Sequence, residues 1–534
     1  MSAQTPASPP IIVRNETMVI GEILVRNARL YPDKIGYVFE GQRRTHRAHL
    51  ARCSRLANAL AQRGLARQAR VAILAQNCIE YVETFGAGEL SGFIIVNLNW
   101  RLAVPELRAI LEDCRPEVLI FEAQFAEQVE AVSDLLVGQA RRISIGPGAD
   151  WAEKYEQVLA ESSETLPAMR AKPNDTAYLI YTSGTTGKPK GVMVGHEGFL
   201  HGARAISLES NVYQTDRMLV VMPLFHIGGK SLMAGWTYRG ATIYLERSFD
   251  VDAILDRISA ERITCAHFAP AMIHSLLESP NLDHHDLSSL RYICYASAPM
   301  NVTLLRRAMR RFGPILAQIY GLTESINATI LHPHQHILDG PDDQTRRLAS
   351  AGQPFLGVEI KVVSDDGSDC PADEIGHILV RDGALMQGYW NNNVVTTEVI
   401  NDGWFHTGDM GFFDREGFLF VADRKKDMII SGGENIYSRE VEEALLTHPA
   451  VEHVAVIGVP DEQWGEAVKA CVVLRKATCA TEQELIEHCR KSIASYKKPR
   501  SVDFLGDLPR LFNGKIDKKA LRTPYWRGQT RQVS

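Results

Sequence analysis

The sequence predicts an α/β fold with mixed sheets in a large N-terminal domain, a small β-barrel at the end of that domain, and a small α+β C-terminal domain. Continuous apolar runs alternate with helix-spaced apolar stretches in the first half of the chain. Unbroken apolar strands are typical of sheets that helices cover on both faces. From residue 355 to 420 short strands follow one another, which favours a small antiparallel sheet or barrel.

The expected elements follow the chain in that order. In the N-terminal part we expect helices at 23–30 and 50–63 and strands at 71–75, 92–97, 218–222 and 291–295. The barrel region has expected strands at 358–363, 377–380 and 417–421, with a turn at 365–367. The C-terminal part has expected helices at 438–446 and 482–495 and strands at 452–459 and 468–474. We place the boundary in the charged segment 423–427, which gives domains 1–425 and 426–534.

Composition excludes several classes of protein. The chain has 534 residues and a net charge of -6, whereas nucleic-acid binders usually carry a basic excess. Its nine cysteines are odd in number and include no Cys-x-x-Cys pair, so we expect buried thiols in a reducing compartment. The polar N-terminus lacks the apolar core of a signal peptide, and no apolar stretch reaches membrane-spanning length. We therefore expect a cytoplasmic protein without a membrane span.

The run from Tyr181 to Val192 is the most informative motif. It places Gly184, Gly187 and several Ser and Thr hydroxyls after an apolar strand, with two lysines close behind. Glycine lets backbone N–H groups approach phosphate oxygens, and successive N–H groups form an anion-binding nest. The spacing differs from a Walker A loop, which needs four residues between its glycines. The loop therefore favours a nucleotide-phosphate binder of another design, and the alternative is a Gly/Thr-rich hairpin turn.

Further motifs occur in a fixed order along the chain. They are Pro223-Leu-Phe-His226, the segments 295–300 and 320–324, the run 403–409, Asp423-Arg424, the segment 430–435 and the run 509–515. In this order and spacing the chain resembles the adenylate-forming (AMP-binding) superfamily, in its acyl-CoA synthetase branch of carboxylate-CoA ligases. The resemblance covers about residue 20 to 525. It implies a mobile C-terminal domain and two half-reactions: a carboxylic acid and ATP give an acyl-adenylate and pyrophosphate, and coenzyme A then displaces AMP.

The resemblance also implies the nucleotide site. Lys190 would add positive charge or order the loop, Glu324 would bind Mg²⁺, and Thr323 would contact the α-phosphate. Tyr320 would stack on adenine, Asp409 would bind the ribose, and Arg424 would assist. The alternatives are a helix N-cap pair for Thr323 and Glu324, and a turn cap for Asp409. The remaining loop and adenine residues implied are Thr182, Ser183, Gly184, Thr185, Thr186, Gly187, Ser297, Ala298, Pro299 and Gly321.

Lys515 is implied as the catalytic lysine that bridges the carboxylate and the α-phosphate. Lys426 is implied as the hinge about which the C-terminal domain rotates, so that Lys515 leaves and coenzyme A enters. Acetylation of Lys515, whose surroundings resemble an acetylation motif of some relatives, would remove its charge. Plain core packing for Trp464 and a solvated charge for Lys498 are the alternatives to coenzyme A binding. The coenzyme A residues implied are Gly432, Gly433, Trp464, Tyr496 and Lys498.

The acyl pocket is implied less specifically. His226 would lie near the carboxylate, with a hydrogen-bonded core histidine as the alternative. Gly228 and Gly229 would leave room for a bulky or long acyl group. The neighbouring Lys230 either faces solvent or recognises a polar or anionic tail. The other pocket residues implied are Ile227, Phe268, Ala296, Gly321, Ile326 and Asn327. The acid would be a medium- or long-chain fatty, an alicyclic or an aromatic acid such as a cinnamate or benzoate.

Other functions stay open at this point. One is an adenylating enzyme that loads a carrier protein, or a luciferase-like oxygenating relative. Another is a catalytically inactive relative that serves as a binding protein. The histidines at 332–336 and 284–285 resemble metal ligands, but we expect ordinary loops there, because no plausible further ligand stands nearby. The sequence leaves a homodimer open.

Overall fold

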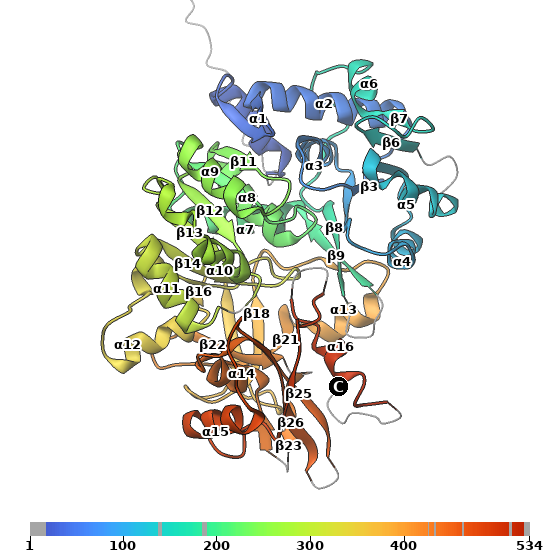
Figure 1. The fold of residues 1–534 in the computed structure, drawn as a ribbon. Coiled ribbons are helices and arrows are strands. Elements are labelled where there is room, and N and C mark those ends of the chain that lie inside the picture. Colours follow the sequence, from blue (N-terminus) through green and yellow to red (C-terminus); the bar gives the residue numbers. More distant parts are fainter. Residues whose placement is uncertain are drawn as a thin grey trace, which may run out of the picture.

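A computed structural model describes residues 18–136, 141–183, 189–298, 300–424, 427–431, 434–461, 464–511 and 515–527 (Figure 1). The side chains of Ser183, Asp423, Arg424 and Asn435 are not described. Within these ranges no helix is both long and apolar enough to cross a bilayer.

Two mixed sheets form the large N-terminal part, as expected from its apolar strands. Sheet A has nine strands in the order β16-β15-β14-β13-β12-β10-β11-β1-β2, and the six from β14 to β1 are parallel. Its strands are β1 (Ile35–Phe39), β2 (Gln42–Thr45), β10 (Arg217–Val220), β11 (Thr242–Leu245), β12 (Cys265–Phe268), β13 (Tyr292–Tyr295), β14 (Leu316–Tyr320), β15 (Thr329–Leu331) and β16 (Gln353–Pro354).

Sheet B has eight strands in the order β19-β9-β8-β4-β3-β5-β6-β7, and the six from β8 to β7 are parallel. Its strands are β3 (Arg70–Leu74), β4 (Ile94–Leu98), β5 (Val118–Glu122), β6 (Arg141–Ile145), β7 (Glu153–Lys154), β8 (Thr176–Ser183), β9 (Pro189–Gly195) and β19 (Gly388–Tyr389).

Helices cover these sheets (Figure 1). Several begin at a side chain that caps a free backbone N–H, such as Thr45 before α2 and Asp250 before α9. The helices are α1 (Gly21–Leu30), α2 (His46–Gln62), α3 (Ile79–Ser91), α4 (Val104–Cys114), α5 (Ala126–Glu130), α6 (Tyr155–Ala160), α7 (His196–Glu209), α8 (Ile227–Arg239), α9 (Val251–Glu261), α10 (Pro270–Glu278), α11 (Val302–Phe312), α12 (Asp342–Arg346) and α13 (Asn393–Val399).

The two faces of sheet A belong to different cores, because successive side chains of a strand point to opposite faces. Met218 and Cys265 pack with Trp236 of α8 in the largest hydrophobic cluster. Ala266 and Phe268 of the same strands pack in a second cluster with the helices α9 to α11. The face that carries α7 and α8 is the one that matters for the site below.

The region after residue 355 forms the expected small barrel as a half-barrel, sheet C. Its five antiparallel strands are β17 (Glu359–Val363), β18 (Gly376–Arg381), β20 (Ile400–Asn401), β21 (Trp404–Phe413) and β22 (Leu419–Arg424). The last of them ends at Arg424, and the next strand in the chain belongs to another sheet.

The C-terminal α+β unit has a core of its own. Val441 and Leu445 of α14 pack against Val456 and Val472 of sheet D. This sheet comprises β23 (Ile429–Ser431), β24 (Glu434–Ile436), β25 (Val451–Asp461), β26 (Gly465–Leu474) and β27 (Ser501–Phe504), and its helices are α14 (Ser438–Leu446), α15 (Glu482–Ser492) and α16 (Lys518–Arg522). The expected fold class is therefore confirmed.

Candidate functional site

The candidate residues gather where parallel strands of sheet A end. His226 follows β10, Ala296 follows β13, and Gly321 follows β14 directly. Ligands of open α/β sheets bind outside the carboxyl ends of the strands, so this edge is the natural place for a site. Gly321 fits only as glycine, because an added Cβ would lie 2.3 Å from the Ile326 carbonyl oxygen.

The Gly/Thr-rich loop joins β8 to β9, which pair as an antiparallel hairpin with Thr182 opposite Lys190. The connection is thus the hairpin of the alternative interpretation. A hairpin is compatible with phosphate binding, because anions bind to the hydrogen-bond donors of a loop whatever strands the loop connects. Gly184, Thr185, Thr186 and Gly187 lie outside the described residues.

Lys190, Tyr389 and Glu324 form a connected group beside this hairpin. The Lys190 ammonium lies 5.2 Å from the centre of the Tyr389 ring, and the Tyr389 hydroxyl donates to Glu324 Oε1 at 2.9 Å. Burial and the Glu324 charge raise the pKa of Tyr389, so it stays a neutral donor. No helix begins between β14 and β15, so the helix-cap interpretation of Thr323 and Glu324 is wrong. Sequence reasoning missed Tyr389, whose position beside Glu324 depends on β19 pairing with β9.

Tyr320 and Asp409 link sheet A to sheet C. The Tyr320 hydroxyl donates to Asp409 Oδ2 at 2.7 Å, and Asp409 is only 5% exposed. Asp409 lies within β21, opposite Arg424 of β22, so it does more than cap a turn. Ser297, another residue of the implied adenine site, has φ of +73°, a backbone conformation that glycine adopts more easily than serine. Pro299 lies outside the described residues.

Lys515 lies near His226. Burial first, and then the charges of Lys515 and Arg101, together lower the pKa of His226 to about 3. The charge of Lys515 thus acts on the strand-end region although Lys515 belongs to the C-terminal unit. Lys515 is exposed, and its carbonyl accepts from the Leu511 N–H at 2.7 Å.

The residues expected in the acyl pocket do not all face one space. Ile227, Ala296 and Ile326 are buried in the cluster that includes α7 and α8. Phe268 points to the other face of sheet A, into the cluster with α9 to α11, and its inclusion in the pocket is corrected.

His267, the residue before Phe268, lies on the face of sheet A that carries α8. A Cβ added to Gly228 would lie 3.8 Å from His267 Cε1 and 3.6 Å from Ser297 Oγ. A side chain could therefore begin at Gly228 without a clash, in ordinary contact with these two residues. Gly229 does not open the pocket, because an added Cβ would lie 2.4 Å from the Pro223 carbonyl oxygen. Strand parity would have found His267 once the covered face of β12 was known.

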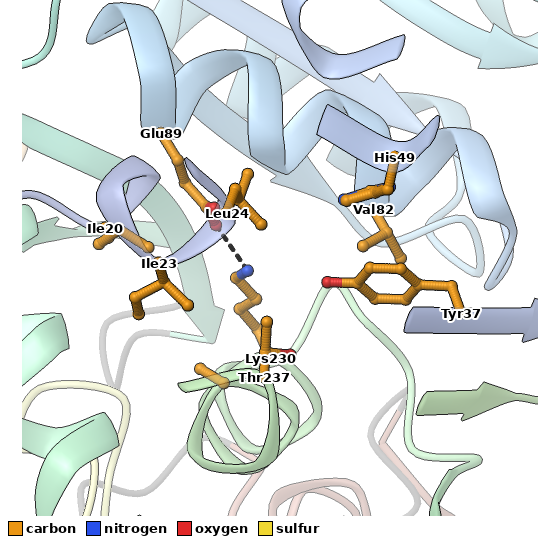
Figure 2. Close-up of a pocket in the computed structure, with 10 residues that line it drawn as sticks. Ile20, Ile23, Leu24, Tyr37, His49, Val82, Glu89, Lys230 and Thr237 are labelled. Atoms are coloured by element: carbon orange, nitrogen blue, oxygen red, sulfur yellow. Dashed lines mark hydrogen bonds and ion pairs between the residues drawn. The ribbon is translucent and has the colours of Figure 1, made fainter. Parts of the chain in front are cut away.

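Lys230 is buried, contrary to the expectation that it faces solvent. It is 5% exposed, and its ammonium donates to Glu89 Oε1 at 2.6 Å (Figure 2). Glu89 also accepts from the Tyr178 hydroxyl, and the ammonium lies 4.5 Å from the centre of the Phe85 ring. The small cavity beside the pair, about 10 Å³, has room for roughly one water molecule. With its ammonium paired to Glu89, Lys230 does not recognise a polar or anionic tail of the substrate.

The candidate coenzyme A residues are at the surface of the C-terminal unit. Trp464 is 36% exposed and Arg500 stacks over its ring at 4.8 Å, so Trp464 is not a core residue. Tyr496 is exposed, and the Lys498 ammonium donates to the Ser495 carbonyl at 3.2 Å. The other candidates, Gly432, Gly433 and the hinge residue Lys426, lie outside the described residues.

The histidines at 332–336 bond within the protein. His332 pairs with Glu209 at 3.2 Å, and the His336 ring pairs with the Tyr295 hydroxyl at 2.9 Å. Within the described ranges no three His, Cys, Asp or Glu side chains converge as a metal cluster. Glu324 nevertheless fits Mg²⁺, which takes one or two carboxylates together with phosphate oxygens and waters.

Comparison with known proteins gives the family. Residues 24–390 match the family model of the AMP-binding enzyme, and residues 440–515 match that of the AMP-binding enzyme C-terminal domain. The chain is 38% identical to indoleacetate–CoA ligase of Aromatoleum aromaticum over 95% of this chain and 98% of that protein. It is 36% identical to feruloyl-CoA synthase of Amycolatopsis, over 94% of this chain and 98% of that one. The solved structure of o-succinylbenzoate CoA synthetase (MenE) from Bacillus subtilis with its acyl-adenylate superposes with a TM-score of 0.83 at 32% identity, over 96% and 99% of the two chains. The chain therefore belongs to the family of AMP-binding enzymes, in the adenylate-forming superfamily.

Proposed function

We propose that the protein is an ATP-dependent acyl-CoA synthetase, an acid-thiol ligase that forms AMP. In the first step a carboxylate oxygen attacks the α-phosphorus of ATP, and the bond to the β-phosphate breaks to release pyrophosphate. In the second step the thiolate of coenzyme A attacks the acyl carbon, and the acyl–oxygen bond breaks to release AMP. The acid would be a fatty, alicyclic or aromatic carboxylic acid.

The observation that carries the proposal is the effect of Lys515 on His226. The first step brings an anion against a polyanion, so it needs positive charge at the point of attack. Lys515 would supply that charge near His226, which follows β10 at the strand ends of sheet A. The relatives named as CoA ligases support the same reaction over nearly the whole chain.

The other residues would hold the nucleotide. Tyr320 would stack on adenine beside Ser297, Ala298 and Pro299, while Asp409 accepts from the ribose hydroxyls with Arg424 assisting. The hairpin loop from Thr182 to Lys190 would bind the β- and γ-phosphates, and Thr323 the α-phosphate. Mg²⁺ held by Glu324 would supply charge neutralisation at the phosphates.

We further propose that residues 426–534 rotate about Lys426 between the two steps. Lys515 and the thiol need the same space in turn, and a few dihedral angles in a polar segment can absorb such a rotation. Gly432, Gly433, Trp464, Tyr496 and Lys498 would then meet coenzyme A. We expect Lys426→Pro, which fixes φ, to spare adenylation and block thioester formation. A Lys426→Pro enzyme with full overall turnover would refute the hinge.

The central test is Lys515→Ala, assayed in each half-reaction. Loss of this charge should slow adenylation by about a hundred- to a thousandfold, roughly 3–4 kcal/mol, as when a transition-state donor is removed. Acid-dependent pyrophosphate exchange measures the first step, and thioester formation from preformed acyl-adenylate measures the second, which should largely survive. Lys519→Ala, an exposed lysine on α16, is the matched control and should leave both rates unchanged.

The outcomes separate the alternatives. Equal loss in both half-reactions would contradict the role of Lys515. Absence of any acid-dependent pyrophosphate exchange by the wild-type protein would favour the inactive binding relative. Faster AMP release with a carrier protein than with coenzyme A would favour the carrier-loading enzyme.

A cytoplasmic location suits this chemistry, because ATP and coenzyme A are supplied there. The nine cysteines are free thiols, most of them buried, as suits a reducing compartment. A homodimer is compatible with the proposal, since one chain supplies every proposed site residue.

A further inference from the structure

Two buried polar side chains beside α7 and α8 lack hydrogen-bond partners. His267 and Asn327 are each 1% exposed. Among the described residues His267 Nε2 has no partner, and neither does the amide oxygen or the amide nitrogen of Asn327. Most buried polar atoms are paired, so each exception needs an explanation. These two side chains lie on the side of sheet A where the acyl group is expected.

Glycines face both side chains. His267 lies 3.8 Å from the position of an added Cβ on Gly228, at the start of α8. Asn327 Oδ1 lies 3.1 Å from the corresponding position on Gly202 of α7. The two helices pack against each other, since an added Cβ on Gly235 would meet Ile206 at 2.5 Å. Both polar side chains thus lie beside glycines of the two helices, and at Gly202 the Ile326 side chain lies beside Asn327, 3.3 Å from the same position.

The backbone around these groups is strained. Ile326, the residue before Asn327, has φ of +61°, a rare conformation for a β-branched residue. Ser297, which lies beside Gly228 with His267, has φ of +73°. Strain of this kind persists only where the surroundings impose it, and it gathers at ligand sites. It therefore marks the same space as the unpaired groups.

Both unpaired groups are neutral. Asn327 carries no charge, and burial lowers the pKa of His267 to about 3, so its ring is uncharged near neutral pH. The nearby cation Lys230 points to the other side of α8 and is held by Glu89. An anionic tail would meet two neutral groups at His267 and Asn327, and an unbranched alkyl chain would leave both groups unpaired.

Given the proposed function, on which this inference rests, we propose that His267 and Asn327 bind a neutral hydrogen-bonding substituent of the acyl group. The substrate is then an aryl monocarboxylic acid whose ring bears a hydroxyl or an N–H. Ile227, Ala296 and Ile326 supply apolar contacts for the ring. His226 lies at the carboxylate end, and the unpaired groups take the substituent.

The test compares acids that differ only in that substituent. The pairs are 4-hydroxycinnamate against cinnamate and indole-3-acetate against 1-naphthylacetate, with decanoate as the alkyl acid. The measurement is kcat/KM for CoA-dependent AMP release. We expect at least one polar acid to exceed its apolar partner by about a hundredfold, because a site built to hydrogen-bond rejects an analogue without the group. A high ratio for the cinnamate pair would indicate that the site binds a hydroxyl, and a high ratio for the indole pair that it binds a ring N–H.

Variants then assign the preference to the two residues. Asn327→Leu and His267→Phe should each reduce the polar-to-apolar ratio at least tenfold, with kcat/KM for the apolar acid kept or raised. Phe268→Leu, on the opposite face of the same strand, is the control and should keep the ratio. If a variant fails to fold, Asn327→Ala or His267→Gln replaces it, and the wild-type ratios are informative without any variant.

The results distinguish the two proposals. AMP release with none of the acids would overturn the proposed function and this inference together. AMP release that is equal for polar and apolar partners, or fastest with decanoate, would leave the proposed function standing and overturn this inference. An unchanged ratio in both folded variants would also overturn it.

Discussion

Buried polar groups are paired on one side of α8 and lack partners, among the described residues, on the other. Toward α3, Lys230 has an ion pair with Glu89 and contacts with aromatic rings. Gly228, two residues earlier and so about 200° away around the helix, faces His267, which has no partner at Nε2 among the described residues. The paired charges on one side stabilise the fold, whereas on the other side we propose that a ligand pairs with the groups that have no partner in the described part of the chain.

This difference has an energetic consequence. A buried charge that loses its partner carries the full penalty of desolvation, so a paired group is strongly destabilised by a single substitution. An unpaired buried group already carries its penalty in the folded protein. Stability should therefore depend on the first side of α8 and substrate preference on the second.

The largest effect on stability is expected from Lys230→Met. The substitution leaves the Glu89 carboxylate buried without its cation, and we expect a loss of about 3–5 kcal/mol in the free energy of unfolding. Denaturant unfolding measures this loss. Lys154→Met is the matched control, since Lys154 pairs with Asp150 at the surface and should contribute less than about 1 kcal/mol.

The double variant Lys230→Met/Glu89→Leu sharpens the comparison. Replacing a buried ion pair with apolar residues is often neutral or stabilising, so most of the lost stability should return. The order of preference among acids should stay that of the wild type in the single and the double variant. A changed preference would place Lys230 in substrate recognition after all.

The second effect is the pH dependence contributed by His267. Its folded pKa of about 3 lies below the unfolded value of about 6.5, so the unfolded chain binds more protons between these values. The contribution of His267 to stability is therefore complete above about pH 6.5. It falls by about 1.4 kcal/mol per unit as the pH drops through that window.

Denaturant unfolding of His267→Gln at pH 7, 6 and 5 measures this contribution. As the pH falls, the variant should lose stability less steeply than the wild type. The two slopes should differ by up to about 1.4 kcal/mol per pH unit. His285→Gln is a control of opposite sign, because the Asn281 carbonyl and the Asp256 carboxylate raise the pKa of the partly buried His285. Parallel curves for the wild type and His267→Gln would show that the pKa of His267 is not lowered in the folded protein.

The sequence predicts much of this molecule because its motifs lie at strand ends. The strands on both sides of the loop after Thr182 and the position of His226 after β10 follow from local patterns of apolar strands and polar loops. The half-barrel and the C-terminal unit follow from strand spacing in the same way. Such features need only neighbouring residues.

The errors come from partners far away in the chain. Lys230 is buried because Glu89, 141 positions earlier, supplies a carboxylate. Phe268 lies on the face of sheet A opposite to that of its neighbour His267, because successive strand residues point to opposite faces. Which of the two faces is the α8 side depends on the helices that cover the sheet. Tyr389 reaches Glu324 because β19 joins sheet B across the chain. None of these pairings has a local signal.

The smallest effect is expected from Asn327→Ala. Its side chain makes no hydrogen bond within the described residues, so none is lost, and relief of its desolvation offsets the lost packing against Gly202. We expect a change in the free energy of unfolding below about 1 kcal/mol. Denaturant unfolding at neutral pH is the measurement.

Asn77→Ala is the matched comparison, because Asn77 is also buried. Asn77 accepts from the Leu224 N–H at 2.8 Å and donates to the Met222 and Glu246 carbonyls at 3.1 and 3.0 Å. Its loss leaves buried backbone groups unpaired and should cost about 2–3 kcal/mol. Equal losses in the two variants would mean that Asn327 stabilises the fold as much as Asn77 does. That result would contradict the difference between the two sides of α8.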